Sequence, residues 1–189
     1  MRKPSLALSS IMAVSIVIAL MLGYQMGIQA QPSNLSLGSS GSVTGHIYVT
    51  IRKADGTIIK YDTHNIVVTI GKTRIRDFLK DGTSGATNAT KYIALSNDAS
   101  PDASWTKLPN EITGSGLARA EGTVQTINST AYNVTHTFTA SASVTVQCAG
   151  LHWSPDSNSD NNLFAAATFT QTSLSSGDEI TITWVVNHS

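Results

Sequence analysis

The sequence predicts an all-β protein: an antiparallel β-sandwich or jelly-roll-like domain of about eight strands with one short helix. Ser and Thr make up 47 of the 189 residues and often stand beside Val, Ile, Tyr or Phe, a composition suited to strands. Between residues 46 and 189, short apolar runs are separated by groups of turn-forming residues. In two of these runs apolar and polar residues alternate strictly, which is typical of half-buried strands. We therefore assign residues 46–189 to the β-sandwich domain.

A β-hairpin is predicted at the start of this domain. Two extended runs flank the pair Asp55-Gly56, which favours a tight turn between antiparallel strands. Ile47, Val49 and Ile51 stand at alternate positions, so we expect them to share the buried face of the first strand.

One helix is predicted where the period of the apolar residues changes. Ile75, Phe78 and Leu79 are spaced at i, i+3 and i+4, and Gly82 follows them as a stop signal. This spacing indicates an amphipathic helix of two to three turns.

The two strictly alternating runs also predict which residues face outward. In the first run, the apolar face consists of Tyr132, Val134, His136 and Phe138. In the second run, it consists of Ile180, Ile182, Trp184 and Val186. Asn133 and Asn187 have the opposite parity, so we expect both on the outer face.

Residues 1–30 are expected to be a signal peptide or a membrane anchor, in the form of a hydrophobic helix. Arg2 and Lys3 precede an apolar stretch whose centre, Ile11–Leu22, has the length of a signal-peptide hydrophobic region. Taken as Leu6–Ile28, the same stretch has the roughly 20 residues that a membrane span needs. Positive charges stay on the cytoplasmic side, so both alternatives place the rest of the chain outside the cytoplasm.

Charged residues are few and unevenly distributed. The formal net charge is zero, which excludes the basic excess of a nucleic-acid-binding protein. Residues 31–119 carry ten Lys and Arg against seven Asp and Glu, whereas residues 120–189 carry five acidic residues and neither Lys nor Arg. Either one end of a subunit is complementary to the other, or the strand order interleaves these charges.

No catalytic motif is found, and we do not expect an enzyme. The five histidines lack the i, i+4 pair of a zinc protease, and no nucleophile elbow, Walker motif or dinucleotide fingerprint occurs. The one cysteine, Cys148, is expected to be a small buried hydrophobe, with an intermolecular disulfide or a reactive thiol as the alternative.

One loop carries oxygen ligands at alternate positions. This spacing lets carboxylate and amide oxygens surround a hard cation such as calcium. The residues are Asp156, Asn158, Asp160 and Asn162. Ala167 stands where a calcium loop would supply a bidentate Glu, so the alternative is a plain polar hairpin loop. No other cofactor is expected.

Five N-x-S/T sequons agree with an external location and predict N-linked glycans. They are Asn34, Asn88, Asn128, Asn133 and Asn187. A glycan needs an outward-facing Asn because its bulk cannot enter a core, and the parity of Asn133 and Asn187 meets this condition.

The order of short motifs between Ile47 and Val186 resembles a β-sandwich domain of phage and virus tail-associated proteins. The motifs are "HNIVVT", "RIRDFL", "KYIALS", "GLARAEG", "CAGLHW" and "SSGDEITITW". This resemblance implies a structural domain and carries over no catalytic residue.

The exported N-terminus, the Ser- and Thr-rich β domain, the sequons and the absence of disulfides resemble a second group, archaeal extracellular filament subunits of the thread or bundling-pilus kind. The resemblance implies that subunits join head to tail by donor-strand complementation, in which an N-terminal strand fills the groove of a neighbour. Residues 31–45 are then either a Ser/Gly-rich linker or the donor strand. The donor residues would be Asn34, Leu35, Ser36 and Leu37, with both leucines on one face.

Together these observations predict an extracellular structural subunit that polymerises with itself into a surface filament, with a role in adhesion or biofilm formation. It would be secreted or held at the cell surface, and it would contact a membrane only through its N-terminal segment. The alternatives are a membrane-anchored, pilin-like surface protein, a virion structural protein, and a secreted carbohydrate-binding module or hydrolase that uses Trp105, Trp153 and the acidic loop.

Overall fold

The computed structural model describes residues 42–81, 89–98 and 100–188. The predicted N-terminal segment 1–30, the predicted donor residues 34–37 and the sequon at Asn88 lie outside the described residues. The fold described below is that of the sandwich domain.

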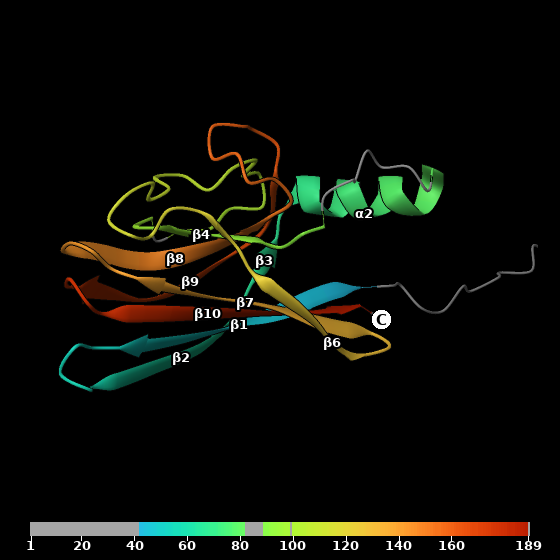
Figure 1. Cartoon of the computed structure of the whole chain (residues 1–189). Coiled ribbons are helices and arrows are strands. Elements are labelled where there is room, and N and C mark those ends of the chain that lie inside the picture. The colour runs from blue at the N-terminus through green and yellow to red at the C-terminus, as the bar shows by residue number, and fades with distance from the viewer. Residues whose placement is uncertain (1–41, 82–88, 99, 189) are drawn as a thin grey trace, which may run out of the picture. The chain divides into compact units, whose positions relative to one another are not determined.

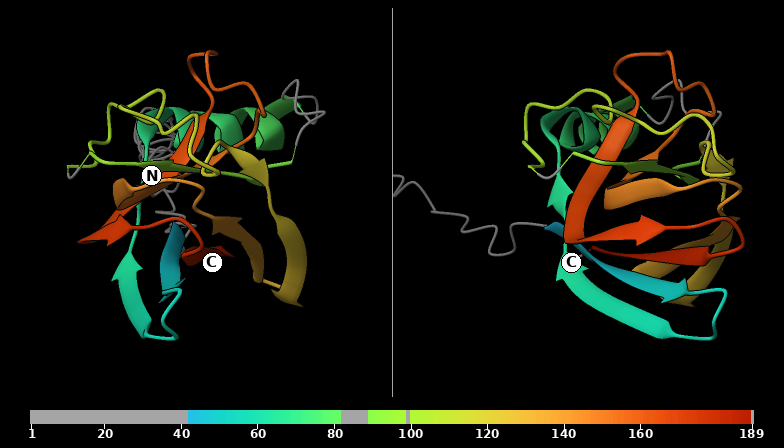
Figure 2. Two further views of the ribbon diagram at one scale, coloured as in Figure 1. Left: turned by 60° about the vertical axis from the view of Figure 1, so that its left-hand side comes forward. Right: turned by 90° about the vertical axis from the view of Figure 1, so that its left-hand side faces the viewer.

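Two antiparallel five-stranded sheets face each other in the described part of the chain (Figure 1 and Figure 2). Sheet A has the strand order β2-β1-β10-β7-β6, and sheet B has the order β3-β9-β8-β4-β5. The strands of sheet A are β1 (Val43–Arg52), β2 (Ile58–His64), β6 (Thr123–Asn128), β7 (Ala131–Thr139) and β10 (Glu179–His188). Those of sheet B are β3 (Ile66–Val67), β4 (Tyr92–Ser96), β5 (Ala120–Glu121), β8 (Val144–His152) and β9 (Leu163–Leu174). The predicted antiparallel sandwich is therefore confirmed, with ten described strands instead of about eight.

Hairpins between consecutive strands determine much of the strand order. The pairs β1–β2, β6–β7 and β8–β9 are neighbours both in sequence and in a sheet. The predicted turn at Asp55-Gly56 joins β1 to β2, and Gly56 adopts the positive φ of 89° that such a turn needs. The run "LARAEGTVQTI" reads as one strand in the sequence but forms two. It divides at Gly122 into β5 of sheet B and β6 of sheet A.

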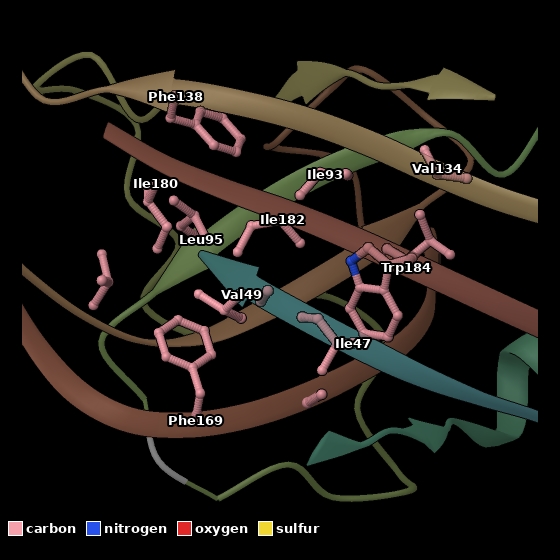
Figure 3. Packing of buried hydrophobic residues seen from close by; sticks show 14 of the residues in the cluster. Ile47, Val49, Ile93, Leu95, Val134, Phe138, Phe169, Ile180, Ile182 and Trp184 are labelled. Carbon is pink, nitrogen blue, oxygen red and sulfur yellow. The ribbon is translucent and has the colours of Figure 1, made fainter. Parts of the chain in front are cut away.

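The main hydrophobic core fills the space between the sheets, as predicted from alternation. Ile47, Val49 and Ile51 of β1 are fully buried. The apolar face of β10 packs beside them, with Trp184 as the largest fully buried side chain (Figure 3). Val134 and Phe138 of β7 are buried in the same core, whereas His136 is half-buried.

A second, smaller core covers the opposite face of sheet B. Small residues on three strands leave room there for side chains from the loop after β4 and from the segment before the helix. This cluster consists of Val68, Ala94, Leu108, Cys148, Leu163 and Ala166. Cys148 is buried as expected, but a register shift between Val146 and Cys148 turns it away from the main core that holds Val146.

The predicted helix forms over Thr69–Asp81 as α2, starting before the periodic residues and ending ahead of Gly82. The helix contacts β9. At Gly71 its backbone lies so close to the backbone of Phe164 in β9 that an added Cβ would stand 2.4 Å from the Phe164 carbonyl oxygen. No helix in the described ranges is long and apolar enough to cross a membrane.

Candidate functional site

The open side of β6 is the most unusual surface of the described domain. β6 ends the strand order of sheet A, so within residues 42–81, 89–98 and 100–188 it pairs on one side only, with β7. All six residues of Thr123–Asn128 are exposed. The strand carries no charge and includes Val124 and Ile127, which are 46% and 50% exposed. An exposed, uncharged and partly apolar edge strand is a template for pairing with another strand.

The register of β6 shows which way its apolar residues point. Val124 pairs with Val134, which is fully buried in the main core, so Val124 shares the inner face of sheet A. Val124 is nevertheless about half exposed, because sheet B does not extend over this edge. A register shift between Thr126 and Asn128 places Ile127 in a bulge. The edge therefore offers both unpaired backbone groups and an uncovered apolar flank.

The other three sheet edges are protected in ways that β6 is not. β3 and β5 have two residues each, too few to pair with a long strand. β2 is longer but carries Lys60 and Asp62 at exposed positions, and charged residues discourage edge-to-edge pairing. Among the described strands, β6 is thus the edge best suited to accept a partner strand.

The segment predicted as linker or donor strand borders the start of the sandwich. β1 begins at Val43, so residues 43–45 pair with β10 and form part of the domain. A donor role is therefore restricted to residues before Val43, and the predicted donor residues Asn34, Leu35, Ser36 and Leu37 lie outside the described ranges.

Three predicted sequons lie within the described residues. Asn128 stands at the β6–β7 turn and is exposed, and its side-chain oxygen accepts a hydrogen bond from the Thr130 backbone N–H at 2.8 Å. Asn133 and Asn187 lie on the outer face of sheet A and are half-buried. The buried Oδ1 of Asn133 has no hydrogen-bond partner. Glycosylation stays a prediction, and Asn128 is the most accessible of these three sites.

In the predicted calcium loop, the oxygen ligands have other partners. Asp160 pairs with Lys107 at 2.9 Å, and Asp156 Oδ1 accepts a hydrogen bond from the Asn158 N–H at 2.9 Å. Asn162 is buried, and its side chain bonds within the protein at both ends. Calcium binding stays a prediction, and the side chains of Asp156, Asp160 and Asn162 already have partners within the protein.

A buried arginine stands at the base of this loop. The Arg119 guanidinium donates to the Ser154 and Asp156 carbonyl oxygens at 2.9 and 3.0 Å, and to Asn162 Oδ1 at 3.1 Å. It also forms a two-pronged ion pair with Glu111 at 2.5 and 3.0 Å, with both side chains almost fully buried. The protein thus supplies its own cation where the loop oxygens point inward.

His152 belongs to the same polar group and is fully buried. Its Nδ1 lies 2.6 Å from Asn162 Oδ1. Burial, and then the nearby Arg119 cation, lower the pKa of His152 to about 3, so it stays neutral. No group of three or more His, Cys, Asp or Glu side chains among the described residues is arranged to hold a metal ion.

The charge asymmetry of the sequence is balanced inside the domain. Four of the five acidic residues in 120–189 pair with basic residues from segment 31–119. The pairs are Glu121 with Lys91, Asp160 with Lys107, Asp178 with Lys53 and Glu179 with Arg52. In the described residues the strand order interleaves these charges, which favours the second of the two interpretations.

Comparison of the chain with protein families, with curated proteins and with solved structures gives no match.

Sequence reasoning missed the β6 edge. The pattern joined Thr123–Asn128 to the preceding residues as one strand and gave no reason to place it at the end of a sheet. The local signal available was Gly122, which separates the two parts but does not show which of them ends a sheet.

Proposed function

We propose that this chain is an extracellular structural subunit that polymerises head to tail by donor-strand complementation into a surface filament. The observation that carries the proposal is the open, uncharged β6 edge of sheet A. In this scheme β6 of one subunit accepts a strand from residues 33–39 of the next.

Backbone hydrogen bonds would supply much of the affinity. A strand laid beside β6 pairs with the N–H and C=O groups that β7 does not use, whatever its side chains are. Its alternate residues then face the same side as Val124, next to the inner face of sheet A.

Leucines at alternate positions fit the uncovered flank of that face. Leu35 and Leu37 have the same parity, so both would pack beside Val124 and extend the main core by one strand. Asn34 and Ser36 would face outward, which keeps the Asn34 sequon accessible to a glycan.

Geometry also explains why such a contact forms a fibre. The donor and the acceptor are different surfaces of one chain, so the interface is heterologous and repeats without closing on itself. Because the charges of the described domain are balanced internally, assembly would depend on strand pairing and apolar contact instead of on charged ends.

Two full-chain variants test the proposal. Leu35→Asp/Leu37→Asp removes the donor, and Val124→Lys/Ile127→Lys places charges on the acceptor edge. Each alone should abolish fibres in negatively stained electron micrographs. Mixed together, they should form dimers and nothing longer, because only one productive interface remains.

Ile58→Lys is the matched control. Ile58 is also exposed, at 56%, and lies on β2 at the opposite edge of sheet A. This variant should form fibres like the wild-type chain. If it blocked assembly while the Val124→Lys/Ile127→Lys chain polymerised, β2 would be the acceptor. If the wild-type chain stayed monomeric under all conditions, the filament proposal would be wrong.

A further inference from the structure

The open end of the β1–β2 hairpin carries a histidine pair that the proposed function does not use. His46 of β1 and His64 of β2 are directly opposite each other in the register. Their ring centroids are 4.0 Å apart. This is the last pair of the hairpin, at the end away from the turn at Asp55-Gly56.

A carboxylate orients one of the two rings. His46 Nδ1 lies 3.0 Å from Asp62 Oδ1, and Asp62 stands two residues before His64 on β2. An ionised carboxylate only accepts hydrogen bonds, so the Nδ1 of His46 carries the proton. The Nε2 of a neutral His46 then keeps its lone pair for another partner.

This arrangement is the one that metal-binding histidines commonly have. A ligating imidazole usually donates its second ring N–H to a carboxylate, which fixes the tautomer and raises the basicity of the ligand. Bonds from zinc to imidazole nitrogen are about 2.0–2.1 Å long, so one ion bridges nitrogens up to about 4 Å apart. Residues directly opposite each other in an antiparallel pair have Cβ atoms about 4.5–5.5 Å apart, so rotation of the two side chains brings one nitrogen of each ring to a shared ion.

The surroundings do not oppose a cation. The outer-face neighbours of His46 are Tyr48, whose ring centroid lies 6.2 Å away, and Val185 on β10. Lys60 is the closest basic residue along β2, two positions beyond Asp62, and it pairs with Thr50. Among the residues that the structure describes, the Asp62 carboxylate is the charged group that contacts the pair. His46 is about one third exposed and His64 is exposed, which leaves access from solvent.

We propose that His46 and His64 form a two-imidazole site for a divalent transition-metal ion of the zinc, nickel and copper group, with Asp62 as the residue that positions His46. Imidazole nitrogen suits these ions, whereas calcium and magnesium prefer oxygen. Water fills the remaining coordination positions. The bound ion would close the open end of the β1–β2 hairpin.

Isothermal titration of the full chain with Zn²⁺, after removal of metal by a chelator, tests this site. We expect one Zn²⁺ ion per chain at pH 7.5. The melting temperature should rise with Zn²⁺, because only the folded hairpin brings the two rings together.

Variants assign the ligands. His46→Gln and His64→Gln should each abolish binding, and Asp62→Ala should weaken it about 10–100-fold as expected for an orienting carboxylate. His188→Ala is the control, since it removes an exposed histidine at the end of β10 and should bind as the wild type does. Circular dichroism verifies that each variant is folded.

Two results would overturn the proposal. One is the absence of Zn²⁺ binding by the wild-type chain. The other is retained binding in either the His46→Gln or the His64→Gln variant, which would place the metal elsewhere. Neither result bears on the filament, whose acceptor edge β6 is at the other end of sheet A.

Discussion

Removing the charge of Glu111 should destabilise the domain strongly. Glu111→Gln keeps the size of the side chain but leaves the Arg119 guanidinium without its carboxylate partner. Both side chains are buried, with 7% and 2% exposed, so water does not replace the lost charge. The expected effect is the cost of an uncompensated buried cation.

Breaking a buried ion pair by removing one partner costs about 3–5 kcal/mol. Arg119 retains three acceptor oxygens from the loop after β8, so we expect the lower end, about 3 kcal/mol. With a urea m-value of about 2 kcal/mol per molar, the unfolding midpoint should fall by about 1.5 M.

Equilibrium urea unfolding measures this shift, and Glu121→Gln is the control. Glu121 also pairs with a basic residue at 2.5 Å, but its pair with Lys91 is exposed, so its loss should change stability by less than about 1 kcal/mol. The double variant Glu111→Gln/Arg119→Met should be more stable than the sum of the single effects predicts, because no charge is left buried. If Glu111→Gln unfolded at the same urea concentration as Glu121→Gln, the reasoning about burial would be refuted.

Three further predictions concern other parts of the fold. Hydrogen bonds from two backbone N–H groups and a lysine lower the pKa of Asp178 from 3.8 to about 2. The ionised Asp178 therefore stabilises the fold above pH 3.8, and this stabilisation is lost as the pH falls towards 2. The Asp178→Asn variant should have a lower melting temperature at pH 7, and its melting temperature should decline less steeply below pH 4 than that of the wild type. In a helix interior Ala is more favourable than Gly by about 1 kcal/mol. Gly71→Ala should nevertheless destabilise the domain, because the added Cβ would meet the Phe164 carbonyl oxygen. A higher urea midpoint of unfolding for this variant would contradict that close contact. Burial raises the pKa of Cys148 to about 12, so a thiol reagent at pH 8 should label it in denaturant and not in the native protein, and fast native labelling would show that the second core opens.

The elements that depend on nearby residues were predictable. The Asp55-Gly56 hairpin, the helix ending before Gly82 and the buried face of β10 each follow from residues within one turn or one strand. Local periodicity determines which side chains can be buried, and the sandwich confirms the predicted buried faces of β1 and β10.

The same local pattern failed where one segment changes sheets or register. The division at Gly122 into β5 and β6, and the turn of Cys148 towards the second core, both depend on which strand lies alongside. Pairing partners are far apart in the chain, so no window of sequence contains the information.

By itself, the sequence determined that the chain has a Ser- and Thr-rich β domain, which residues alternate into its core and which Asn residues face outward. Only the tertiary structure decided that β6 ends a sheet with Val124 uncovered, that Arg119 joins Glu111 to the loop after β8, and that His46 faces His64. The physical reason is that edges, buried ion pairs and cross-strand pairs arise from contacts between residues distant in sequence. Such contacts exist only after the strands have paired.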